Sequence, residues 1–98
     1  MRMPDIEEIK RRLTPVFDQY NVQSATLFGS VAKGTATENS DVDLLVDSRL
    51  KGLRFVGLME AVHTALLLPV DLLDVSHIEK GSLIDREIRD TGVVIYEK

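Results

Sequence analysis

A Gly-Ser pair and an Asp-x-Asp motif are the residues of this chain whose types and spacing could do chemistry together. Gly29 and Ser30 follow an apolar run, and after ten further residues Asp41 and Asp43 open a second apolar run. Glycine lets a backbone approach a phosphate closely, and the N–H groups that begin a helix attract anions. Paired carboxylates suit a divalent cation. The pattern therefore indicates a site that holds a phosphate at the turn and a metal at the carboxylates.

The carboxylates predict a magnesium-type site. Side chains alternate along a strand, so Asp41 and Asp43 share one face, about 7 Å apart. Oxygen ligands in a chain without cysteine favour Mg²⁺ or Mn²⁺ over Zn²⁺. Asp71 opens a third apolar run and would complete the set if its strand lies beside that of Asp43, about 4.8 Å away. Two metals there could hold the attacking and leaving oxygens of a phosphoryl transfer, with Asp71 also helping to deprotonate the acceptor hydroxyl.

The phosphate side of the site is expected to comprise Gly29, Ser30 and Lys33. Ser30 supplies a hydroxyl and an N–H, and Lys33 supplies a positive charge, although its position equally suits a solvated side chain. An isolated Asp-x-Asp at the start of a strand is often only a solvated edge or a capping pair. The combination with the Gly-Ser turn and Asp71 is what favours the site.

The elements that must position these residues alternate along the chain. Helical periodicity predicts helices over 6–20, 51–68 and 78–90 and one turn over 31–34. Strand patterns occupy 24–28, 41–46, 70–75 and 93–96. We expect an α/β or α+β fold, with a small mixed sheet of about four strands and helices mainly on one side. The predicted inner faces of the second and third long helices are Phe55, Val56, Met59, Val62, His63 and Leu66, and Leu83, Ile84 and Ile88.

Length and charge restrict the classes of function. At 98 residues, the chain is expected to form one domain over 1–98. The formal net charge of −4 disfavours direct binding of nucleic acid but leaves a nucleotide carried with magnesium open. No apolar run has membrane-spanning length, and the lack of cysteine suits a reducing compartment. We therefore expect a cytoplasmic protein that does not bind membranes.

The motifs resemble those of a known family. Residues 29–35, Gly-Ser-Val-Ala-Lys-Gly-Thr, and residues 40–46, Ser-Asp-Val-Asp-Leu-Leu-Val, are similar to the nucleotidyltransferase motif of the polymerase β superfamily. The similarity is greatest to the minimal nucleotidyltransferase (MNT) proteins of prokaryotes, and it covers nearly the whole chain. It implies the polymerase β-type fold, binding of a nucleoside triphosphate with Mg²⁺, and transfer of the nucleoside monophosphate to a hydroxyl. Many members carry Arg where this chain has Val31, which bears on the triphosphate contact.

The resemblance also implies a partner. Many MNT proteins are antitoxins of a HEPN-domain RNase toxin and adenylylate a tyrosine of that toxin from ATP. The shortness of the chain favours an acceptor held by another protein or by a second copy, in a hetero-oligomer or homodimer. The acidic charge suits a basic partner. Two alternatives stay open: a binding module that neutralises the partner by occlusion, and a subunit that modifies a small molecule such as an antibiotic.

Overall fold

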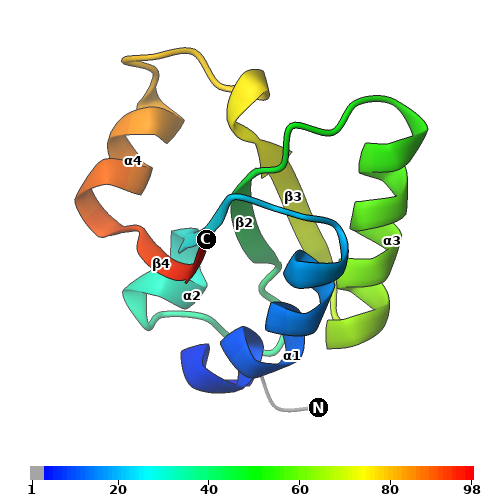
Figure 1. The fold of residues 1–98 in the computed structure, drawn as a ribbon. Helices are drawn as coiled ribbons and strands as arrows, with labels where there is room; N and C mark the ends of the chain where they lie inside the picture. Colours follow the sequence, from blue (N-terminus) through cyan, green and yellow to red (C-terminus); the bar gives the residue numbers. More distant parts are fainter. Residues whose placement is uncertain (1–3) are drawn as a thin grey trace.

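Four strands form one mixed sheet in the computed structural model, which describes residues 4–98 (Figure 1). The sheet order is β3-β2-β1-β4. The pairs β1–β2 and β1–β4 are antiparallel, whereas β2 and β3 are parallel. This arrangement confirms the expected mixed sheet. The strands are β1 (Ser24–Phe28), β2 (Val42–Asp47), β3 (Val70–Asp74) and β4 (Val93–Glu97).

The two long helices, α1 (Ile6–Gln19) and α3 (Leu53–Leu66), pack together on one side of the sheet, as expected. Helix α4 (Leu83–Thr91) lies on the other side, next to α2 (Gly29–Lys33) (Figure 1). Between them, the long helices and the sheet bury an apolar core that includes Leu27, Leu44 and Leu58. None of the helices described in residues 4–98 combines the length and apolar character needed to cross a membrane. The helices are α1 (Ile6–Gln19), α2 (Gly29–Lys33), α3 (Leu53–Leu66), the 3₁₀ turn η1 (Val75–His77) and α4 (Leu83–Thr91).

Helix α1 follows its sequence signals closely. The Asp5 carboxylate accepts a hydrogen bond from the Glu8 N–H at 2.8 Å and so caps the first turn. Pro15 stands inside the helix on its exposed side, and the helix continues through it. Asn21 adopts a left-handed conformation just beyond the end, with φ of 57°. One stripe of the helix is fully buried and comprises Ile9, Leu13 and Phe17.

The predicted inner face of α3 is partly wrong. Val56, Met59 and His63 are exposed, whereas Leu58, which the prediction omitted, is fully buried. The buried stripe follows a spacing of four residues through Leu58, Val62 and Leu66. Because apolar side chains surround most of this helix, periodicity alone cannot select which stripe meets the sheet.

Helix α4 is shorter than predicted. It begins at Leu83, where Ser82 accepts a hydrogen bond from the Asp85 N–H at 3.2 Å, and not near residue 78. Gly81, with φ of 85°, breaks the chain before it. Leu83 and Ile84 were expected to face inward but are 84% and 41% exposed. The shorter helix therefore covers less of the sheet than its apolar residues suggested.

Candidate functional site

The register of the sheet brings Asp43 and Asp71 into one row, and Gly29 lies beside it. Phe28, the last residue of β1, pairs with Asp43, and Gly29 follows it directly. Asp43 in turn pairs with Asp71 on the parallel strand β3. Paired residues on neighbouring strands point to the same face, and the strands lie about 4.8 Å apart. The expectation that the strand of Asp71 neighbours that of Asp43 is confirmed.

Gly29 lies in direct contact with Asp43. Its φ of +70° is in the left-handed region, and a Cβ built on it would stand 3.2 Å from Cγ of Asp43 and overlap Oδ2. Gly29 is also the first residue of α2, whose N-cap residue, Phe28, supplies no side-chain hydrogen bond. The first N–H groups of a helix have no acceptor within it. In the described part of the chain, no hydrogen bond outside the helices and strands uses the N–H of Gly29 or of half-buried Ser30.

Several negative charges converge on Asp43. Burial raises the pKa of its carboxyl, and the nearby charges of Asp71, Asp41 and Glu87 raise it further. Within residues 4–98, no Lys or Arg lies within ion-pair distance of Asp41, Asp43 or Asp71. This excess of negative charge disfavours the ionised form of Asp43, and a bound cation would offset it.

The carboxylate oxygens of Asp41, Asp43 and Asp71 suit Mg²⁺ or Mn²⁺, although the three side chains are not gathered around a single position. In the part of the chain that the structure describes, no group of three or more His, Asp or Glu side chains stands close enough to hold a metal. Asp41 lies exposed in the loop before β2, not within the strand as predicted, and Asp71 is exposed at the start of β3. No hydrogen bond or ion pair within residues 4–98 fixes either side chain, so both can turn towards a cation that prefers oxygen ligands.

Lys33 meets a residue that the sequence did not reveal as part of the site. Its Nζ lies 2.7 Å from Oε1 of Glu87 on α4. Glu87 is far from Lys33 in the chain, and only the packing of α4 beside α2 brings them together. No sequence motif marks Glu87. Val31, at the position where many proteins of the resembled family carry Arg, is only 6% exposed and packs in the core.

Asp74 is buried and stabilises the fold. It pairs with the core residue Val46 and therefore lies on the face of the sheet opposite to that of Asp43 and Asp71. It is 3% exposed. Its two oxygens accept hydrogen bonds from the N–H and hydroxyl groups of Ser48 and Ser76, at 2.7–3.0 Å. Burial acts to raise the pKa of Asp74, but these four hydrogen bonds outweigh it and lower the pKa to about 2.

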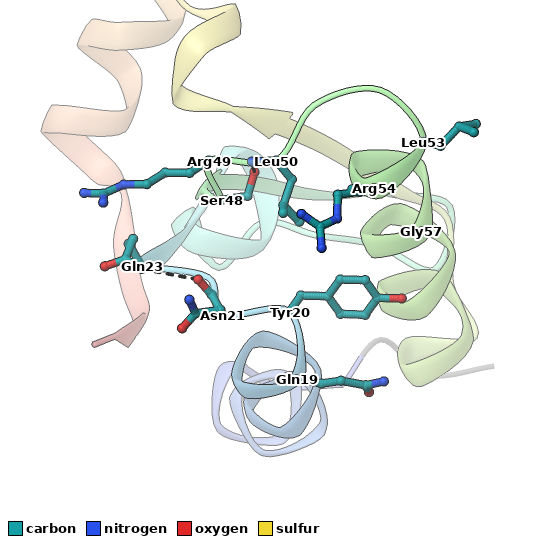
Figure 2. Close-up of a pocket in the computed structure, with 10 residues that line it drawn as sticks. All are labelled: Gln19, Tyr20, Asn21, Gln23, Ser48, Arg49, Leu50, Leu53, Arg54 and Gly57. Carbon is teal, nitrogen blue, oxygen red and sulfur yellow. Dashed lines mark hydrogen bonds between the residues drawn. The ribbon is translucent and has the colours of Figure 1, made fainter.

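A large surface hollow lies away from the row of carboxylates. Its volume is about 710 Å³, and it opens where β1 begins and β2 ends (Figure 2). Gly29 follows the other end of β1. Tyr20 reaches across it to α3, where a Cβ on Gly57 would lie 3.5 Å from the Tyr20 hydroxyl. None of the predicted site residues lines this hollow. Chemistry, and not cavity size, therefore identifies the candidate site.

Comparisons with known proteins agree with the geometry. Residues 11–98 match the family described as "Polymerase beta, Nucleotidyltransferase". The chain is 37% identical over 87 residues to "Protein adenylyltransferase MntA" of Thermococcus cleftensis, covering 83% of this chain and 88% of that protein.

Solved structures share the fold. A chain of a toxin-antitoxin crystal structure with AMP-PNP superposes with a TM-score of 0.76 at 22% identity, covering 91% of this chain and 73% of that one. A chain from the complex of a tri-AMPylated HEPN toxin of Shewanella oneidensis with MNT antitoxin gives 0.70 at 18% identity, covering 95% and 73%. The polymerase β-type fold expected from the sequence is thus confirmed.

Proposed function

We propose, because this chain belongs to the polymerase β nucleotidyltransferase family, that it transfers AMP from ATP to a hydroxyl group of a partner protein. The observation that carries the proposal is the row of Asp43 and Asp71, which the strand register aligns, with Gly29 in contact with Asp43. Its relative in Thermococcus cleftensis, named a protein adenylyltransferase, supports the choice of nucleotide and acceptor class. We take residues 1–98 as one nucleotidyltransferase domain.

Asp41, Asp43 and Asp71 would hold Mg²⁺, with Mn²⁺ as a substitute, in a one- or two-metal arrangement. Bound Mg²⁺ would neutralise charge on the phosphates. Gly29 leaves room for the triphosphate to approach the backbone, and the hydroxyl and N–H of Ser30 donate hydrogen bonds to it. Lys33 supplies the nearby positive charge. Asp71 accepts the proton of the acceptor hydroxyl, whose oxygen bonds to the α-phosphorus as the bond to pyrophosphate breaks.

The partner we propose is a HEPN-type toxin, with this chain as its antitoxin and a tyrosine of the toxin as acceptor. One of the complexes that share the fold pairs an MNT antitoxin with a HEPN toxin, and that toxin is AMPylated. The net charge of −4 suits association with a basic, RNA-binding partner. We propose that the reaction takes place in the cytoplasm, where ATP and an RNA-binding partner are both present.

Intact mass spectrometry tests the proposal. The chain and a HEPN-type partner protein are incubated with ATP and Mg²⁺, and we expect the partner to gain the mass of one AMP or a multiple of it. The double variant Asp41→Ala/Asp43→Ala should give no gain. Asp47→Ala is the matched control, because it removes a carboxylate from the far end of β2, and it should retain transfer.

Two other outcomes would contradict the proposal in different ways. A stable, neutralised complex without any mass change, formed equally by the double variant, would indicate neutralisation by occlusion. Transfer of AMP to a small hydroxylated acceptor, with the partner protein unmodified, would indicate a small-molecule modifier.

A further inference from the structure

An ion pair between Lys33 and Glu87 joins α2 to α4 beside the row of carboxylates. The Nζ–Oε1 distance is 2.7 Å, and the side chains are 44% and 34% exposed, so a ligand can reach both groups. Helix α2 begins with Gly29 and Ser30, the residues proposed to contact phosphate, and Lys33 is its one cation. The same helix therefore carries the phosphate contacts at its start and this ion pair at its end.

Glu87 also lies near enough to Asp43, one of the candidate metal ligands, for their charges to interact. Its charge is among those that raise the pKa of Asp43 on β2. Helix α4 contacts β1, whereas Asp71 lies on β3, at the other side of β2, so negative charge reaches Asp43 from both sides. The ammonium of Lys33 offsets the charge of Glu87. A triphosphate that enters beside α2 would compete with Glu87 for this ammonium, because phosphate oxygens are strong acceptors of charge-assisted hydrogen bonds.

We propose that Glu87 is a positioning residue that holds Lys33 beside the site until the phosphates of ATP take the ammonium as their own ion partner. This inference rests on the proposed function, since it requires ATP at the turn of Gly29 and Ser30. An ion pair between partly exposed side chains contributes little stability, so the exchange costs little. Glu87 thus lowers the affinity for ATP slightly while it keeps Lys33 in place.

Calorimetric titration of ATP in saturating Mg²⁺ tests this inference. Glu87→Gln removes the competing charge, and we expect its Kd for ATP to fall about twofold to fivefold, the range that an exposed ion pair allows. Lys33→Met should raise the Kd. In the Lys33→Met background, Glu87→Gln should lower the Kd by a smaller factor, because no ammonium remains to be released.

Glu8→Gln is the matched control. Glu8 is also 34% exposed and forms an ion pair with Arg12 at 3.0 Å, but on α1. Its loss should leave the Kd for ATP unchanged. This control separates the loss of any exposed ion pair from the loss of the pair at the site.

Three outcomes would overturn the inference. Weaker ATP binding by Glu87→Gln would make Glu87 part of the metal site, and an equal gain with and without Lys33 would mean that it acts by charge alone. A lower unfolding temperature of Glu87→Gln with an unchanged Kd would mean that the ion pair only stabilises the fold. If the unmodified protein still transfers AMP in any of these cases, only the inference about Glu87 fails. If the unmodified protein binds no ATP, both this inference and the proposed function fail.

Discussion

The carboxylate of Asp43 occupies the space that a side chain on Gly29 would fill. A Cβ at this position would lie 3.2 Å from Cγ of Asp43 and overlap its Oδ2. The sequence suggested that this glycine serves a phosphate. In the structure it serves the central carboxylate as well, because only a residue without Cβ leaves Asp43 its place on the face it shares with Asp71.

Gly29→Ala should therefore reduce AMP transfer by more than its loss of stability explains. The left-handed backbone costs an alanine about 1–2 kcal/mol, and the added methyl displaces Asp43. We expect AMP transfer to fall about 100-fold or more. Gly34→Ala is the matched control, because Gly34 has a similar φ of +75° and nothing within 4 Å of its Cβ position. It should lose similar stability, measured by urea unfolding, and keep its activity. Equal activity losses in the two variants would contradict the steric explanation.

Asp43→Asn should stabilise the protein without metal while it removes activity. A carboxyl whose folded-state pKa is raised opposes folding at neutral pH, because its charge is less favourable in the native state than in the unfolded chain. The neutral amide escapes this cost, so its unfolding temperature should exceed that of the unmodified protein. Transfer should fall about 100-fold or more, since a metal ligand supports several kcal/mol of transition-state stabilisation.

Magnesium provides the control for Asp43→Asn. Added Mg²⁺ should raise the unfolding temperature of the unmodified protein and raise that of the variant less. An Asn variant that is less stable than the unmodified protein, or that gains as much from Mg²⁺, would argue against a cation at Asp43.

Asp74→Ala should destabilise the fold by about 3 kcal/mol. It leaves the N–H and hydroxyl of buried Ser48 without their acceptor, and each unsatisfied buried group costs about 1–3 kcal/mol. Denaturant unfolding measures the change. Asp90→Ala, on the exposed side of α4, is the control and should stay within about 0.5 kcal/mol. A similar small change for Asp74→Ala would show that these hydrogen bonds are dispensable.

Asp74 should also make the fold sensitive to acid. Its pKa is about 2 in the folded protein and near 3.8 in the unfolded chain. A lowered folded-state pKa means stability that is fully present above pH 3.8 and lost as the pH falls towards 2, about 2 kcal/mol in all. Unfolding free energies measured between pH 6 and pH 2 should show this loss, and Asp74→Asn should show less of it.

The central part of the site could be predicted because local signals agree with one another. Apolar runs located β2 and β3, and alternation then put Asp43 and Asp71 on one face once the strands paired. Glu87 could not be predicted, because its place depends on how α4 packs against α2. The face of α3 was misjudged for a related reason: its apolar residues surround the helix, and only tertiary packing selects Leu58 over Met59.

The parallel pairing of β2 and β3 has a consequence for how the chain can vary in length. The two carboxylates meet only through the alignment of Asp43 with Asp71, and the intervening α3 and its loops do not enter that alignment. Insertions in those loops would leave the site intact. One residue inserted within β3 before Asp71 would turn its carboxylate towards the core and put an apolar side chain in its place. The relative position of the Asp43 and Asp71 carboxylates thus depends on the register of β2 and β3 far more than on the length of the chain between these strands.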